Sequence, residues 1–197
     1  NINFQLNFEL EENSLIKIIN LSDDNSEKNF INNLFNFNLG KYAILKNYKI
    51  DKKSNTNIKY DYSSITQKEN SISETFIFSS GSDYIKNEVS CDLEGQYSSA
   101  FINGIHLLSK NKHHEIRTNT NHLYENTKSY QLIKSVIDDN SKSVYQGKIY
   151  VDSKAQKTDG YQLSKAVLLN EKAEFNAKPE LEIYADDVKC SHGSASG

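Results

Sequence analysis

The chain has 197 residues, of which 37% are hydrophobic and 25% charged, and its net charge is −3. This length suits one or two domains, and it is sufficient to bury a sizeable core. A negative chain without a basic stripe argues against a nucleic-acid or anionic-membrane binder, and no apolar run of about 18 residues predicts a membrane span.

The ends and the cysteines set further expectations. The chain begins with Asn1 rather than Met and has no signal-peptide pattern, so we expect a piece of a longer protein. Its two cysteines, Cys91 and Cys190, are expected to be free thiols in a reducing compartment.

Alternating apolar residues predict strands in chain order from the first residues onward. Residues 89–93 place Val89, Cys91 and Leu93 on one face. Residues 2–10 place every second residue on one face, namely Ile2, Phe4, Leu6, Phe8 and Leu10. Residues 145–151 alternate in the same way. In residues 180–184 we expect Leu181 and Ile183 to be buried, with Glu180 and Glu182 facing outward.

Other stretches are less clear. Residues 26–37 and 130–137 fit either a helix or a strand, because short apolar runs do not separate the two periods. Residues 51–73 are polar and could hold a long loop. There is a single proline, few glycines, and no composition shift that marks a domain boundary.

A turn followed by a small residue recurs along the chain, at intervals near multiples of roughly 14 to 15 residues. This pattern favours a stacked coil of short strands, a β-solenoid, slightly over a β-sandwich. The small residues are Ser14, Ala43, Ser99, Ser143, Ala155 and Ala173.

Four of the five histidines are expected to be structural. The adjacent pair His113–His114 sits in a polar turn leading into a strand, where neighbours face opposite ways and do not easily share one ion. His106 and His122 have no local partners. The remaining candidates are Cys190 and His192, which would share one face of a strand about 6.5–7 Å apart. Thiolate and imidazole are ligands for transition metals and iron–sulfur species, but two ligands are not a complete site. Spacing alone favours a strand end with a capping histidine over a metal site.

Two stretches carry a family resemblance: "KPELEIYADDVKCSHG" at 178–193 and "VYQGKIYVDSKAQKTDGYQLSKAVLL" at 144–169. They resemble the SufB/SufD family of SUF iron–sulfur cluster assembly proteins, and the first stretch is more similar to the SufD branch. The resemblance is dense from residue 144 onward and looser from 87 to 143.

The resemblance implies an all-β, right-handed parallel β-helix core over residues 1–197, with the family's flanking helical parts absent. It also implies a non-catalytic scaffold that pairs through its β-helix edge with SufB and works with the SufC ATPase. His192 and Cys190 would then hold a transient iron–sulfur cluster shared with the partner chain. No cluster is expected on the isolated fragment, which could form a homodimer.

The resemblance further implies a bacterial cytoplasm, or a plastid or apicoplast stroma. The chain has no phosphate-binding glycine-rich loop and no nucleophile elbow, so we expect no ATPase or hydrolase activity of those classes. Two alternatives stay open: a structural β-helix dimerisation domain without a metal role, and an extracellular polysaccharide-binding β-helix. The second would require aromatic grooves and paired carboxylates.

Overall fold

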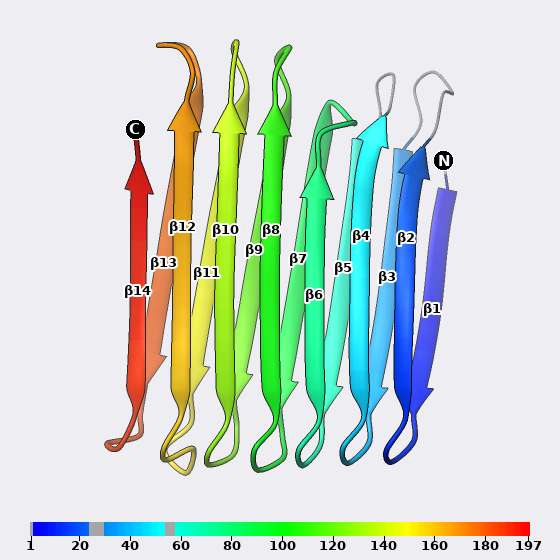
Figure 1. Ribbon diagram of the computed structural model, residues 1–197, viewed down its shortest axis with the longest axis vertical. Coiled ribbons are helices and arrows are strands. Elements are labelled where there is room, and N and C mark those ends of the chain that lie inside the picture. Colours follow the sequence, from blue (N-terminus) through cyan, green and yellow to red (C-terminus); the bar gives the residue numbers. More distant parts are fainter. Residues whose placement is uncertain (1, 24–29, 54–57) are drawn as a thin grey trace.

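The protein forms a right-handed parallel β-helix. The computed structural model describes residues 2–23, 30–53 and 58–197, and every regular element within these ranges is a β-strand. Successive strands alternate between two parallel sheets of seven strands each, and the chain advances steadily from one end to the other (Figure 1). The predicted all-β solenoid is therefore confirmed. No helix of the described part could cross a membrane.

One sheet has the order β1-β3-β5-β7-β9-β11-β13 and the other β14-β12-β10-β8-β6-β4-β2. The strands are β1 (Ile2–Leu10), β2 (Leu15–Asp23), β3 (Phe30–Leu39), β4 (Ile44–Lys53), β5 (Ile58–Gln67), β6 (Ile72–Ser79), β7 (Tyr84–Leu93), β8 (Ser99–Leu108), β9 (His113–His122), β10 (Lys128–Ile137), β11 (Lys142–Val151), β12 (Asp159–Leu168), β13 (Glu174–Ile183) and β14 (Lys189–Ser196).

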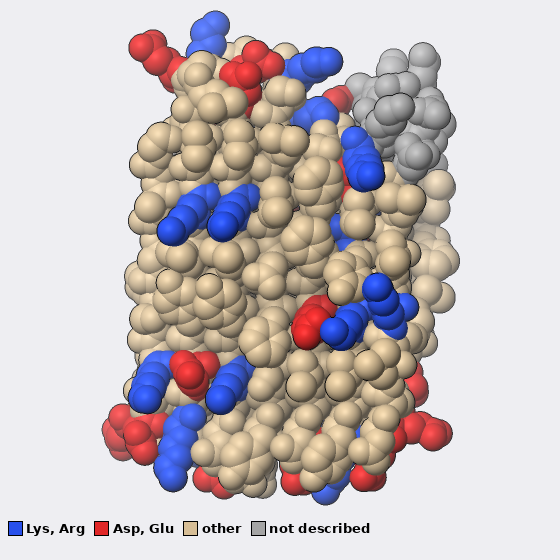
Figure 2. All heavy atoms as spheres, in the orientation of Figure 1, with Lys and Arg blue, Asp and Glu red and all other residues tan. Residues whose placement is uncertain are grey.

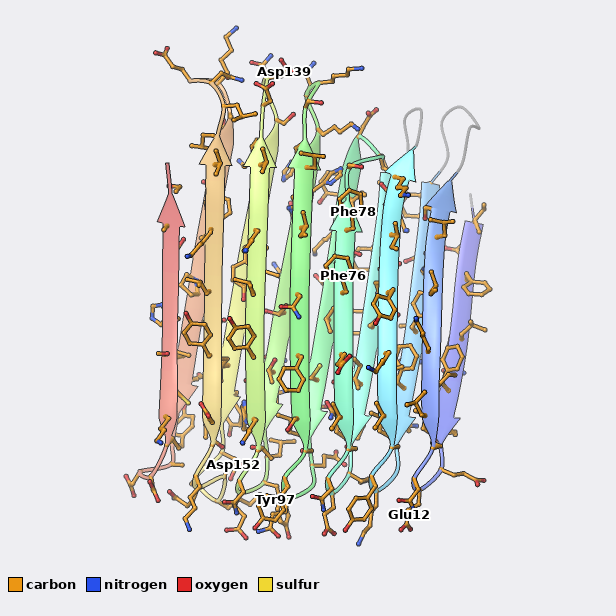
Figure 3. The ribbon with its side chains drawn as sticks, in the orientation of Figure 1. Glu12, Phe76, Phe78, Tyr97, Asp139 and Asp152 are labelled. Carbon is orange, nitrogen blue, oxygen red and sulfur yellow. The ribbon has the colours of Figure 1, made fainter. Side chains whose placement is uncertain are left out.

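Tight turns between successive strands, at both ends of the coil, explain the small-residue pattern. The residue before the small one often has a left-handed backbone, as at Asn70 and Tyr97, and the hydroxyl that follows closes the turn (Figure 3). Ser71 Oγ donates to the Lys68 carbonyl oxygen at 2.6 Å. Ser99 and Ser143 follow such turns, as the first residue of β8 and the second residue of β11. The turns themselves end at the following positions: Ser14, Ala43, Ser71, Ser98, Ser141, Ala155 and Ala173.

The two segments that fitted either period are strands where the structure describes them. Residues 30–37 belong to β3 and residues 130–137 to β10, whereas residues 26–29 lie outside the described residues. The expected loop over 51–73 is wrong for most of its length, because residues 58–67 form β5. The inward side chains of β5 include Lys59, Asp61 and Ser63, so its alternation is not one of apolar and polar residues.

The interior of the coil is apolar along much of its length and polar in places. Val89, Cys91 and Leu93 are fully buried in the main cluster, as their alternation predicts. In the N-terminal half, Lys49 and Asp61 form an ion pair that is almost completely buried, and Asn33 Nδ2 donates to Asp61 Oδ2 at 3.2 Å. Burial lowers the pKa of Lys49, and the Asp61 carboxylate opposes that shift.

Within the described residues, the first and last strands of each sheet have one unpaired edge. In the described chain, β13 and β14 each have a ladder neighbour on one side only, as do β1 and β2. Leu181 and Ile183 align with the buried residues Ile149 and Val151, so they face inward as predicted. The predicted burial is nevertheless wrong for Ile183, which is 39% exposed because no further coil covers it. Leu181 is half-buried.

Candidate metal centre

Cys190 and His192 lie on β14, the last strand of its sheet. β14 pairs in parallel with β12, and the register places Cys190 beside Gly160 and His192 beside Gln162. Gly160 and Gln162 are both buried inward residues of β12. Cys190 and His192 therefore share the inward face, as their spacing predicts, at the open end of the coil.

The two side chains differ in their surroundings. Cys190 is half-buried and packs against a cluster that includes Ile149 and Ala155. Burial raises the pKa of the Cys190 thiol, so the thiol is protonated near neutral pH and must lose its proton to ligate a metal. His192 is exposed, because no described residue covers it. An exposed imidazole beside a half-buried thiol can offer two metal ligands to a molecule that docks at this end.

The described residues contain no group of three or more His, Cys, Asp or Glu side chains that could hold a metal ion. Cys190 and His192 therefore do not form a closed site by themselves in this part of the chain. A structural metal site takes about four ligands, so the remaining ligands would have to come from outside the described residues.

A buried network of polar side chains holds Gln162, the residue beside His192 in the ladder. The sequence analysis did not predict this network. Tyr145 Oη donates toward Gln131 Oε1 at 3.0 Å and lies 3.3 Å from Gln162 Oε1. Gln162 Nε2 donates to the Glu180 carbonyl oxygen at 3.2 Å. This network fixes the amide directly below the imidazole. Its only signal in the sequence is Gly147, a glycine inside an apolar strand pattern.

Gly147 leaves the space that this network occupies. A Cβ at this position would collide with both Tyr145 Oη and Gln162 Oε1. We expect Gly147→Ala to lower the free energy of unfolding by about 1–3 kcal/mol, the usual cost of overpacking a core. Denaturant midpoints measure this effect. Gly197→Ala is the control, since nothing lies within 4 Å of its Cβ. Equal midpoints for the two variants would contradict the packing described.

The other histidines lie away from β14. His106 and His122 point into the interior and contact hydroxyls: His106 Nδ1 is 2.7 Å from Ser143 Oγ, and His122 Nε2 is 2.8 Å from Ser129 Oγ. His114 was expected in a polar turn, but it is fully buried on β9 with Nε2 2.7 Å from the Ser82 carbonyl oxygen. Its neighbour His113 lies near the surface, 3.0 Å from Glu115.

The carboxylates of β13 do not resemble an acid–base pair. Glu180 is 2.7 Å from Lys178, and Glu182 forms an ion pair with Lys148. The hydrogen bond from Lys178 lowers the pKa of Glu180, whereas a glycosidase acid needs a raised pKa. These residues line a shallow hollow on the outer surface of β9, β11 and β13. The hollow therefore gives no support to polysaccharide hydrolysis.

Comparisons with known proteins agree with the fold and its terminal strand. Residues 4–197 match the family described as "SUF system FeS cluster assembly, SufBD core domain". Over 173 residues the chain is 31% identical to the iron–sulfur cluster assembly protein SufD of Escherichia coli, covering 88% of this chain and 41% of that protein.

Two shorter matches are stronger in identity. A SufBD family iron–sulfur cluster assembly protein of Synechocystis is 47% identical over 64 residues, which is 32% of this chain and 14% of that protein. The chloroplastic protein ABCI7 of Arabidopsis thaliana is 46% identical over 68 residues, 34% of this chain and 14% of its own length. The chain spans less than half the length of these curated relatives.

Proposed function

Because the chain belongs to the SufBD core family of the SUF iron–sulfur cluster assembly system, we propose that it is a non-catalytic scaffold subunit on which a nascent cluster forms beside His192 and Cys190. The observation that carries the proposal is the open strand β14, which presents an imidazole and a thiol on one face next to an unpaired edge. The similarity to E. coli SufD over most of this chain supports a SufD-like role.

A partner chain completes the site. An open sheet edge exposes backbone N–H and C=O groups, and pairing with a second β-helix both satisfies these groups and brings further ligands. We assign SufB as that partner and SufC as the subunit that hydrolyses ATP. The complex binds the cluster only transiently, as the product that it assembles. The bacterial and chloroplastic relatives support a bacterial cytoplasm, or a plastid or apicoplast stroma, as the compartment.

The hydrogen-bond pattern of β14 allows a direct test of edge pairing. The N–H groups of Lys189 and Gly197 donate to the carbonyl oxygens of Thr158, just before β12, and Ala166 within β12. Odd-numbered residues of β14 therefore point their backbone groups toward β12, and even-numbered residues point theirs to the open edge. Ser194→Pro removes one N–H from the open edge and leaves the ladder with β12 intact.

We expect Ser194→Pro to weaken co-purification with SufB by roughly tenfold, because one ladder bond is lost and a ring obstructs the edge. The measurement is recovery of tagged complex from cells that co-express the three proteins, together with the melting temperature of the free subunit. Ser194→Ala, which keeps the N–H, is the matched control. Unchanged recovery of a folded Ser194→Pro variant would exclude pairing through this edge.

A further inference from the structure

A short pattern, Tyr-x-Leu-x-Lys-x-Val, occurs twice on neighbouring strands, at residues 130–136 of β10 and 161–167 of β12. The register places Tyr130 beside Tyr161 and Lys134 beside Lys165. The two tyrosine rings stack with their centroids 5.1 Å apart. Like side chains therefore form four rows across the outer surface of the sheet, opposite to the interior of the coil.

The outer face of β8, β10 and β12 is largely apolar and uncovered. β8 continues the rows with Phe101, Ile105 and Leu107. Leu107 is 51% exposed and Val167 50%. Figure 2 shows most of this face without charged side chains, and the labelled Phe76 and Phe78 of Figure 3 extend the apolar surface onto β6. Parallel sheets are normally covered on both faces, and a contiguous exposed apolar patch marks an interaction surface.

Two lysines interrupt the apolar field. Lys134 and Lys165 are exposed on neighbouring strands, and a pair of basic side chains over β10 and β12 is visible in Figure 2. Neither lysine forms an ion pair with any residue in the described ranges. The outward positions between the tyrosine and valine rows carry no carboxylate. The face therefore combines apolar surface with uncompensated positive charge.

We propose that this face binds an amphipathic α-helix of a partner protein, whose apolar stripe carries carboxylates that meet Lys134 and Lys165. Three strands span about 10 Å, which matches the width of a helix. The seven residues from Tyr130 to Val136 span about 20 Å, the length of a helix of roughly 13 residues. The inference does not depend on the proposed cluster chemistry, which lies at the open edge of β14.

The charges select this occupant over others. A second copy presenting the same rows would place lysines against lysines, and like charges in an interface are unfavourable. A cover from the same polypeptide would have to supply carboxylates for both lysines, because lysines are rarely buried without partners, and the labelling of Val167→Cys below tests this case. An exchangeable partner that supplies its own carboxylates satisfies both conditions.

The test uses a synthetic 14-residue helical peptide with a leucine stripe flanked by glutamates, and a second peptide in which lysines replace these glutamates. Fluorescence anisotropy measures binding, and circular dichroism measures the helix gained. We expect the acidic peptide to bind and the basic one not to bind. The double variant Lys134→Glu/Lys165→Glu should bind the acidic peptide at least roughly tenfold more weakly than the wild type, and it should bind the basic peptide. The matched control is Lys154→Glu/Lys172→Glu, which makes the same charge change in exposed turns.

Three results would overturn the proposal. The first is equal binding of the two peptides by the folded protein, or binding of neither. If the Lys134→Glu/Lys165→Glu variant does not fold, the neutral variant Lys134→Gln/Lys165→Gln takes its place. The second is a homodimer in sedimentation that Lys134→Glu/Lys165→Glu dissociates. The third is protection of Val167→Cys from maleimide in the full chain without a partner, which would show that the polypeptide covers its own face.

Discussion

Complexes that carry His192→Gln are expected to lose their iron–sulfur cluster while the subunit keeps its stability. Glutamine keeps a polar side chain of similar reach but does not replace the imidazole nitrogen as a ligand for iron. The side chain is exposed at the open end, so the free energy of unfolding should change by no more than about 0.5 kcal/mol. Iron and sulfide content of the complex co-expressed with SufB and SufC, together with the melting temperature, measures both effects.

Two comparisons make this result specific. Ser191→Ala changes the neighbouring residue, which faces away from the interior, and should leave the cluster content unchanged. Cys190→Ala should have a smaller effect than His192→Gln, because the thiol is half-buried and protonated before the complex forms. A full cluster content in a stable His192→Gln complex would show that His192 is only the end of a strand.

Mild acid is expected to destabilise the solenoid strongly, because its interior holds neutral histidines. Burial lowers the pKa of His114 to about 4 and of His122 to about 3, and it lowers the pKa of His106 as well. In the unfolded chain a histidine has a pKa near about 6.5. Above that pH neither state is protonated, so the histidines do not make stability depend on pH.

Below pH 6.5 the unfolded chain binds protons that the folded protein excludes, so the free energy of unfolding falls with falling pH. Each buried histidine contributes a slope of about 1.4 kcal/mol per pH unit, until the pH reaches its folded pKa. Between pH 6.5 and 4.5, His114 and His122 together should remove about 5 kcal/mol, and His106 adds to this loss. Around His114, Asp51 opposes the shift, whereas Lys112 and His113 enhance it.

Urea midpoints measured from pH 8 to pH 4.5 test this expectation. His122→Gln removes one titrating group, so its slope should be shallower than that of the wild type. His113→Gln is the control, because His113 lies near the surface with its side chain 37% exposed. Parallel curves for all three proteins would show that the interior histidines do not set the acid sensitivity.

The sequence predicts this fold best where the interior is apolar. Val89, Cys91 and Leu93 alternate with polar residues, and all three are buried as expected. β5 escaped prediction because a solenoid interior also accepts polar side chains that bond to one another across coils, as Lys49 and Asp61 do. Such bonds join residues far apart in sequence, so no local pattern reveals them.

The site was predicted as far as strand periodicity reaches. Two residues on one strand must share a face, which places Cys190 beside His192. The contact of Gln162 with Tyr145, and the position of Gln162 beside His192, depend on how successive coils align. That alignment is set by the lengths of the turns, which the noisy spacing of small residues does not define. The prediction that Ile183 is buried was wrong for a related reason, because Ile183 faces inward but no described coil covers it.

The regular stacking of coils also bears on how this protein can evolve. Lys142 lies beside His113 in the ladder, and Arg117 bonds Gln146, 29 residues further along. Duplication or loss of one such unit would lengthen or shorten the molecule by about 4.8 Å and leave every other coil in register. Cys190 and His192 lie on the final strand, so such a change would preserve the terminal surface. Selection can thus adjust the distance between β1 and β14 without rebuilding the residues on either strand.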